Sequence, residues 1–269
     1  MSYLYSLTCN TIKIMKPFKF YILLLITFIA LSASGQEEKP RFLYIETGID
    51  FISGDPPQKD YIRADVDQYS PDYVTTSLRG LLYKNYFTIK AEKKILNNRI
   101  GLLSGIRYTT MVSTLGKDAY WTDSPDFFYL LFRQEETKTE YLKVREIKQV
   151  TGYLGIPLEV RIYPYQPRGF NVYYKIGADI NYRLHSKTNA GFFNDEMEIF
   201  EDELSKVVEK PWAFYSSLHL GVGFRIGQEE KPGVNIEILI PATIMTGSRE
   251  SLVSPGAGAG FMLNARIPF

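Results

Sequence analysis

Apolar and polar residues alternate along much of the chain beyond residue 35, the period of a β-strand whose two faces meet different surroundings. Between residues 170 and 184, for example, Ile176 lies on an apolar face and Lys175 on the opposite face. The same pattern predicts eight strands, at residues 43–51, 78–95, 100–112, 154–162, 170–184, 214–226, 234–240 and 257–269. The second is the least regular, with Phe87, Ile89 and Ala91 on its apolar face.

The lengths of these segments favour a membrane barrel. Several are about 12 to 18 residues long, whereas strands of soluble proteins usually have about 5 or 6 residues and a tilted membrane strand needs about 9 to 11. Short connections at 97–98, 166–168 and 228–232 alternate with long ones at 54–76, 116–145 and 186–210. This alternation is typical of outer-membrane barrels. The sequence therefore predicts an all-β, up-and-down antiparallel transmembrane β-barrel of eight strands with long extracellular loops.

Two further segments, 127–133 and 140–144, could form a hairpin. If that hairpin entered the membrane, the barrel would have ten strands and a wider lumen. Because residues 134–148 are strongly charged, we expect it to stand outside the lipid as part of an outer loop.

A soluble barrel or sandwich also alternates, with its apolar face buried in a core. The two cases differ only in which face looks inward, so a lipocalin-like soluble protein that binds an apolar ligand is the alternative. Glycines interspersed among charged residues favour an inward polar face, since glycine makes room in a narrow lumen.

On the membrane interpretation, five acidic and six basic side chains point into the lumen. They are Glu46, Asp50, Glu159, Asp179 and Glu237, and Arg107, Arg161, Lys175, Arg183, Arg225 and Arg266. Buried charges must pair, and an eight-stranded barrel is just wide enough for side chains to fill it. The near balance predicts a lumen closed by ion pairs, with a narrow charged pore or proton path as the alternative.

The amino-terminal residues read as a targeting segment. Lys16 and Lys19 precede the apolar run 21–31, and the small residues 33–35 follow it, as in a cleaved signal peptide. We expect residues 1–35 to be an upstream segment plus signal peptide, with Met15 as the start, and 36–269 to be the barrel. An uncleaved anchor helix is the alternative. Export and the barrel pattern together predict the cell outer membrane.

Aromatic residues cluster near predicted strand ends, where lipid head groups attract amphipathic rings. One group flanks the turn at 166–168 and the other stands at the opposite end of its strand. The first comprises Tyr163, Tyr165, Phe170, Tyr173 and Tyr174, and the second Trp212, Phe214 and Tyr215.

Composition and spacing give no catalytic, cofactor or metal residues. Lys and Arg total 31 against 30 Asp and Glu, which leaves no basic field for nucleic acid, and one cysteine cannot build a disulfide framework. His185 adjoins Ser186, but neighbours in a strand face opposite sides. Ser217 and His219 share a face about 7 Å apart, too far for a direct hydrogen bond. We therefore predict that the protein is not an enzyme.

The long loops offer the remaining binding surface. The acidic stretch 194–203 could hold a divalent cation or bridge lipopolysaccharide through one, although a solvated loop or short helix explains it as well. Loops on a rigid scaffold are also natural sites for a protein partner.

Three features carry a resemblance to a known family: the signal peptide, the stretch 152–159 (GYLGIPLE) and the last strand ending at 263–269 (LNARIPF). The chain resembles the outer-membrane β-barrel domain family common in Bacteroidetes, to which PorT-like proteins belong, and more distantly the OmpA-type eight-stranded barrel. The alternate residues of the last strand are similar to the signal read by the barrel-assembly machinery, and they are Phe261, Leu263, Ala265, Ile267 and Phe269. The family lends no catalytic residues.

These observations together imply a non-enzymatic outer-membrane barrel with a plugged lumen. It would act as an envelope scaffold, an assembly factor or a loop-mediated binder, with a narrow uptake channel as the alternative. Its expected partners are outer-membrane lipid and lipopolysaccharide, the barrel-assembly machinery and a protein at the outer loops.

Overall fold

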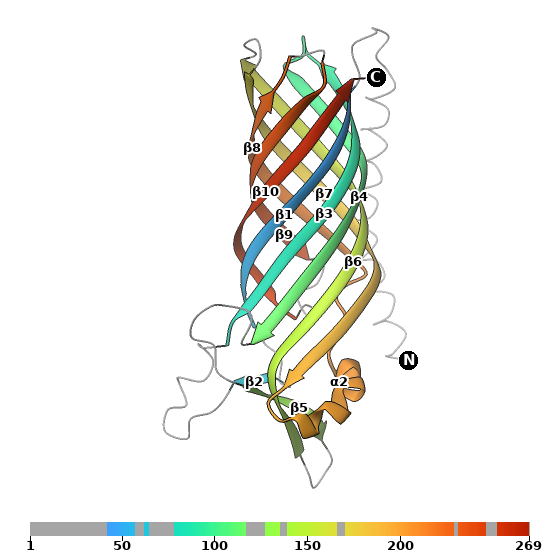
Figure 1. Ribbon diagram of the computed structural model, residues 1–269, viewed down its shortest axis with the longest axis vertical. Coiled ribbons are helices and arrows are strands. Elements are labelled where there is room, and N and C mark those ends of the chain that lie inside the picture. Colours follow the sequence, from blue (N-terminus) through green and yellow to red (C-terminus); the bar gives the residue numbers. More distant parts are fainter. Residues whose placement is uncertain are drawn as a thin grey trace, which may run out of the picture. The chain divides into compact units, whose positions relative to one another are not determined.

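Antiparallel strands close into a ring in the computed structural model (Figure 1). Among the described residues, eight strands form this ring: β1 (Phe42–Asp55), β3 (Gly80–Ile95), β4 (Ile100–Gly116), β6 (Thr139–Tyr165), β7 (Phe170–Phe192), β8 (Phe214–Ile226), β9 (Gly233–Met245) and β10 (Ser254–Pro268). Each ring strand pairs with the ring strand that follows it in the sequence, and β10 pairs with β1, so the ring has no free edge. The predicted up-and-down barrel is confirmed.

The structure describes residues 42–56, 62–64, 78–116, 127–134, 139–165, 170–228, 231–245 and 252–268. The predicted signal peptide and start at Met15 lie outside these residues, as does Phe269.

The predicted hairpin does not enter the ring. β5 (Phe128–Gln134) pairs with the beginning of β6 on one side and with the short β2 (Ile62–Ala64) on the other. The ring is closed instead by the pairing of β6 with β7. The ten-stranded alternative is therefore wrong, since these strands lie beside the ring (Figure 1).

The polarity of the two faces is that of the membrane interpretation. Ile176 and Leu220 are 51% and 55% exposed, whereas Lys175 and Arg225 are 1% and 0% exposed. Every ring strand carries at least one large apolar side chain that is exposed. These side chains are Ile45, Phe51, Phe87, Ile89, Ile106, Leu154, Ile156, Ile162, Phe170, Ile176, Leu184, Phe214, Leu218, Leu220, Ile226, Val234, Ile238, Ile240, Phe261, Leu263 and Ile267. This orientation is the reverse of the one that a soluble lipocalin-like protein requires.

Short connections lie at one end of the ring, which we call the short-turn end. Between β3 and β4 the chain turns through Leu96, Asn97 and Asn98, all with positive φ. Gly227, with φ of 126°, follows β8. A left-handed backbone suits asparagine and glycine, which explains why these short segments reverse the chain.

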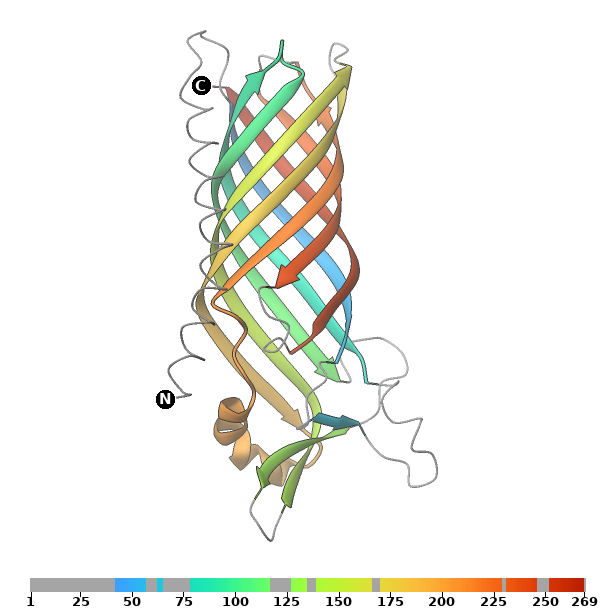
Figure 2. The same cartoon turned by 180° about the vertical axis from the view of Figure 1, so that it is seen from behind.

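β6 and β7 extend far beyond the other strands, a difference from the predicted loops 116–145 and 186–210. β6 already begins at Thr139 and β7 continues to Phe192, paired with each other over this overhang (Figures 1 and 2). The pairing shifts between Gly152 and Tyr153, so a bulge interrupts the alternation that the sequence pattern followed. On β7 the alternation changes its face at this bulge, because Leu184 is the extra residue. On β6 the inward face does not change there, and the pattern ends because the polar Lys148 points outward and the apolar Ile147 inward.

The overhang carries a cap, which we define as β2, β5, η2 (Asp195–Phe200), α2 (Glu201–Val207) and the paired ends of β6 and β7. The predicted acidic stretch lies in η2 and α2. An apolar cluster, the cap core, joins the cap to the nearest inward residues of the ring. Its buried members are Ile52, Leu78, Leu82, Met111, Leu115, Phe128, Leu130, Phe132, Leu142, Val144, Ile147, Tyr153, Phe192, Leu204, Val208, Tyr215, Leu252 and Val253.

Several of the aromatic residues predicted for the lipid boundary point inward instead. Tyr163, Tyr173 and Tyr215 are buried, whereas Tyr174 and Phe214 are about half exposed on the outer wall. The position of each ring follows the alternation of its strand, which outweighs any preference of the ring for a head-group layer. The prediction was wrong for the three buried tyrosines.

Among the described residues, no helix combines the length and the apolar character needed to cross a membrane.

Candidate functional site

The lumen holds a large set of buried ionisable side chains. Among the described residues, six acidic and eight basic side chains are buried: Glu46, Asp50, Glu92, Glu159, Asp179 and Glu237, and Lys84, Lys90, Lys94, Arg107, Arg161, Lys175, Arg225 and Arg266. A buried charge is costly unless it is paired and hydrogen-bonded, so the contacts of these groups decide what the lumen can do.

Glu159 of β6 lies at the centre of this network and is fully buried. Lys90 of β3 approaches one carboxylate oxygen to 2.6 Å, and Arg107 of β4 approaches the other to 3.2 Å. Lys175 of β7 lies 3.6 Å away. Three strands therefore supply cations to one carboxylate, which ties together the wall formed by β3, β4, β6 and β7.

Arg107 joins opposite parts of the ring. Its guanidinium donates to both carboxylate oxygens of Asp179 on β7, at 2.8 and 2.7 Å, and to Glu46 on β1 at 2.8 Å. Its Nε donates to Thr88 of β3 at 2.9 Å. Because three nitrogens of one guanidinium donate to different strands, these charge-assisted bonds fix its orientation. Lys90 also pairs with Glu46.

Glu237 of β9 forms a second node. Lys175 lies 2.5 Å from one carboxylate oxygen, and Arg161 lies 2.7 Å from the other. The hydroxyl of Tyr173 and the side-chain amide of Asn264 donate to the same carboxylate at 2.5 and 3.0 Å. Because Lys175 contacts both Glu237 and Glu159, the two nodes form one network across the lumen.

The short-turn end of the lumen is filled by tyrosines and arginines. Tyr44 and Tyr163 donate to the two oxygens of Glu92, at 2.5 and 2.6 Å. Arg225 donates to both tyrosine hydroxyls, at 3.0 and 2.6 Å. Its guanidinium lies 4.7 Å from the centre of the Tyr163 ring, within the range of a cation–π contact.

Towards the cap, the pairing becomes sparser. Lys84 lies 2.8 Å from Asp50, and Ser217 donates to Asp179 at 3.0 Å. Gly48 makes room for the ring of Tyr86, since a side chain at that position would overlap the ring. The Tyr86 ring in turn lies 4.6 Å from the Arg107 guanidinium. Nearer the cap, the apolar side chains of the cap core fill the interior of the barrel.

The described interior side chains thus meet one another across the lumen. Cations and carboxylates from β1, β3, β4, β6, β7 and β9 lie at ion-pair distance from one another. Such an arrangement links strands on different sides of the ring.

The structure places ten of the eleven predicted lumen charges on the buried face. It brings together Glu46, Arg107, Glu159, Asp179, Lys175, Glu237 and Arg161 in the connected network. Asp50 and Arg225 belong to neighbouring contacts, and Arg266 donates to the backbone carbonyls of Gln228 and Lys231 at the short-turn end. Arg183 is only half-buried, next to the bulge of β7.

Sequence reasoning missed the charges of β3, namely Lys84, Lys90, Glu92 and Lys94. The signal was present, because these residues occupy alternate positions opposite the apolar face of Phe87, Ile89 and Ala91. It was obscured by Lys93, an additional charge on the outward face.

The residues weighed as catalytic pairs are engaged elsewhere. Ser186 pairs with Thr151 at 3.0 Å, and Ser217 donates to Asp179. His219 is buried, 3.8 Å from both Glu159 and Asp179. Among the described residues, no three His, Cys, Asp or Glu side chains group in a way that could hold a metal ion.

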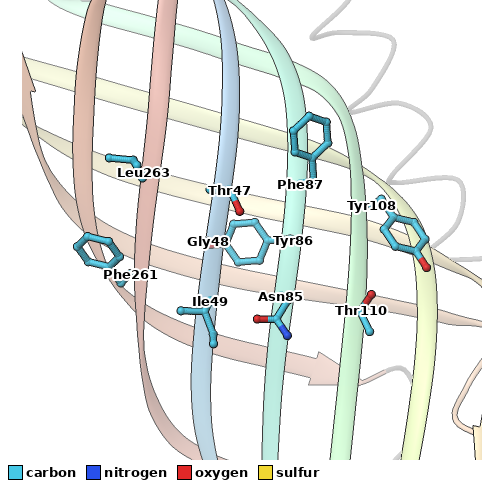
Figure 3. Close-up of a pocket in the computed structure, with 10 residues that line it drawn as sticks. All are labelled: Thr47, Gly48, Ile49, Asn85, Tyr86, Phe87, Tyr108, Thr110, Phe261 and Leu263. Carbon is cyan, nitrogen blue, oxygen red and sulfur yellow. The ribbon is translucent and has the colours of Figure 1, made fainter.

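The outer wall carries a groove of about 610 Å³ (Figure 3). It spans β10, β1, β3 and β4 and is lined by Thr47, Gly48, Ile49, Asn85, Tyr86, Phe87, Tyr108, Thr110, Phe261 and Leu263. Strand register explains the hollow, since the small Thr47 stands between Leu263 on one neighbouring strand and Phe87 on the other. At one edge, the hydroxyl of Tyr108 lies 3.1 Å from Nε2 of His185 on β7.

No protein-family model matches the chain, and no curated protein matches it. Solved structures similar to it include Ail, the attachment invasion locus protein of Yersinia pestis, at 11% identity and a TM-score of 0.32, covering 87% of this chain and 100% of that chain. The outer membrane protein OprG from Pseudomonas aeruginosa has 11% identity and a TM-score of 0.36, with 87% and 98% covered. The outer membrane protease OmpT from Escherichia coli has 11% identity and a TM-score of 0.35, with 86% and 97% covered.

The closed ring and the orientation of its two faces define the fold. The resemblance of residues 152–159 and 263–269 to the Bacteroidetes barrel family stays a prediction.

Proposed function

We propose that this chain is a non-enzymatic β-barrel protein of a bacterial outer membrane, with a lumen closed by ion pairs and a cap that provides its working surface. The observation that carries the proposal is the inverted polarity of the ring. Exposed Ile176 and Leu220 stand beside fully buried Lys175 and Arg225 on the same two strands. A protein in water would gain by the opposite arrangement, whereas hydrocarbon outside the ring favours this one.

The closed ring supports the same environment. In hydrocarbon every backbone N–H and C=O must find a partner within the protein, which only helices and closed barrels achieve. Pairing of β10 with β1 removes the edge that an open sheet would expose. The ring therefore meets the main physical requirement for spanning a bilayer.

The network around Glu159 and Glu237 supports a structural rather than a conducting lumen. Its ion pairs link strands on different sides of the ring, and the cap core fills the barrel between these pairs and the cap. We therefore propose that the protein acts through the cap, as an envelope scaffold, an assembly factor or a binder of a partner protein.

Three partners follow from this proposal. The apolar outer wall would contact outer-membrane lipid, including lipopolysaccharide. The barrel-assembly machinery would read β10, whose Phe261, Leu263, Ala265 and Ile267 are exposed on the outer face. A partner protein would bind the cap, where the acidic η2 and α2 lie.

Fractionation of expressing cells tests the location. We expect the protein in the outer-membrane fraction, with an amino terminus at Gln36 by mass spectrometry and faster migration on gels when the sample is not boiled. A pool in the soluble periplasmic fraction, with unchanged migration after boiling, would contradict the proposal.

Planar-bilayer recording tests the closed lumen separately. The purified, heat-modifiable protein should give no steady single-channel conductance. Reproducible steps that disappear after boiling would instead favour the narrow uptake channel.

A further inference from the structure

The outward face of β6 and β7 changes from apolar to basic where the strands pass from the ring into the cap. Lys148 and Lys187 are exposed there, and among the described residues neither side chain makes an ion pair or a hydrogen bond. Lys148 is paired with Asn189, and Lys187 with Val150, so the two lysines are diagonal neighbours on one face. Diagonal neighbours in a sheet are about 7–8 Å apart, close enough for one anion to contact both.

Two more cations continue this surface towards β5. Arg145 is exposed, with its guanidinium 5.3 Å from the centre of the Phe193 ring. Lys143 lies 4.7 Å from the centre of the Phe127 ring. We call Lys143, Arg145, Lys148 and Lys187 the basic strip. Lys148 and Lys187 repel each other as diagonal like charges, so this part of the strip favours an anionic partner. Glu146, between Arg145 and Lys148 on β6, is half-buried.

His185 lies between the groove of the outer wall and the basic strip. Tyr108 lines the groove, and its hydroxyl contacts His185 at 3.1 Å. Lys187 is the next but one residue after His185 on β7, so it continues the surface from the groove towards the cap. Figure 3 shows Tyr108 at the edge of the groove, with Phe87 beside it.

We propose that the groove and the basic strip form one binding site for a phosphorylated, acylated lipid of the outer leaflet. An acyl chain occupies the groove between Phe87 and Phe261, and a headgroup phosphate lies between Lys148 and Lys187. The volume of about 610 Å³ falls within the range of about 300–1,000 Å³ that is usual for small-molecule sites. Lysine ammonium groups bind phosphate as point charges.

This site differs from the acidic stretch that the sequence first suggested for lipopolysaccharide. The acidic residues of η2 and α2 would need a divalent cation to hold a phosphate, whereas the basic strip binds it directly. Retention of the lipid should therefore survive chelation of divalent cations.

The inference rests on the proposed membrane location, and its test separates the two. The full-length protein is placed in nanodiscs of phosphatidylcholine that contain either bisphosphorylated lipid A or the same lipid without its phosphates. Native mass spectrometry then measures the lipid A that stays bound. Failure to enter nanodiscs in a heat-modifiable form would defeat the proposed function. Successful insertion with equal retention of both lipids would overturn only this inference.

Charge-removing variants locate the headgroup. Lys148→Gln/Lys187→Gln should retain bisphosphorylated lipid A roughly 10- to 30-fold less well, given the usual contribution of a basic residue near a lipid phosphate. Lys206→Gln/Lys210→Gln removes the same charge from exposed positions outside the strip and should change retention little. Equal loss in the two double variants would show a general effect of charge and overturn the site.

A groove-filling variant locates the acyl chain. Thr47→Phe places a ring in the groove, whereas Leu43→Phe adds a ring on the same strand outside it. We expect Thr47→Phe alone to lower retention, with heat-modifiable migration kept in both variants. Unchanged retention in Thr47→Phe would overturn the groove as part of the site.

Discussion

The lumen and the cap core are two parts of one continuous interior, yet they are filled with opposite kinds of side chain. On β4, Arg107 points into the ionic network, and four residues further along the same face Met111 belongs to the cap core. On β6, Glu159 and Ile147 show the same contrast. The change along each strand shows that one inward face holds charged pairs in the lumen and apolar side chains in the cap core.

Each filling stabilises the molecule in its own way. The cap core gains free energy from apolar surface removed from water, as in a soluble domain. The network around Glu159 gains from pairing alone, and loss of one partner leaves a buried charge uncompensated. Single substitutions should therefore act differently in the two regions.

Glu159→Gln should have the largest effect. It leaves Lys90 and Lys175 with less negative charge at a fully buried site, and loss of one partner from a buried pair costs about 3–5 kcal/mol. The urea midpoint of the folded band on unboiled gels should fall accordingly. Glu201→Gln, at an exposed position of α2, serves as the control. Equal midpoints for the two variants would show that the network contributes little.

Ile176→Arg should have the next largest effect, because it introduces a charge on the outer wall. A basic residue facing the bilayer midplane costs about 2–4 kcal/mol in a membrane barrel. Ile199→Arg makes the same change in η2, where Ile199 is 78% exposed, and should cost almost nothing. Unfolding from phospholipid vesicles measures both. Similar small costs would mean that Ile176 does not meet hydrocarbon.

Leu204→Ala should weaken the cap and leave the ring intact. Leu204 is buried in the cap core on α2, and such truncations cost about 2–5 kcal/mol; we expect about 2–3 because the helix is short and can relax. Limited proteolysis should cut near residues 195–208 more rapidly than in the unaltered protein. The urea midpoint of the barrel should stay unchanged. A fall in that midpoint would show that cap and ring unfold together.

The sequence predicted the ring well because alternation is a local property that membrane strands must keep. Ile176 and Lys175 were assigned to opposite faces from period alone, and the structure places them so. Tyr173 shows two signals in conflict, since its aromatic ring suggested the lipid boundary while its place in the period put it inside. The alternation predicted the position of Tyr173 correctly, because successive side chains of a strand point to opposite faces of the sheet.

The cap and the groove could not be predicted in the same way. The cap core combines β5, α2 and inward residues of several ring strands, and no local pattern reveals such distant packing. Arg183 was placed inside, but the bulge beside it disturbs the alternation on β7. The basic strip was missed for the same reason, since Lys187 lies beyond that bulge in a segment predicted to be a loop.

Tyr108→Phe should have the smallest effect and tests the link between the groove and the basic strip. It removes only the hydroxyl that contacts His185, a hydrogen bond of the kind that contributes about 0.5–1.5 kcal/mol. Tyr174→Phe removes a hydroxyl from a ring of similar exposure that has no hydrogen-bond partner among the described residues. A lower urea midpoint for Tyr108→Phe alone, abolished when His185→Ala is already present, would assign the loss to this pair. If both tyrosine variants shift equally, the contact does not fix His185, and the groove and strip would have to be treated as separate surfaces.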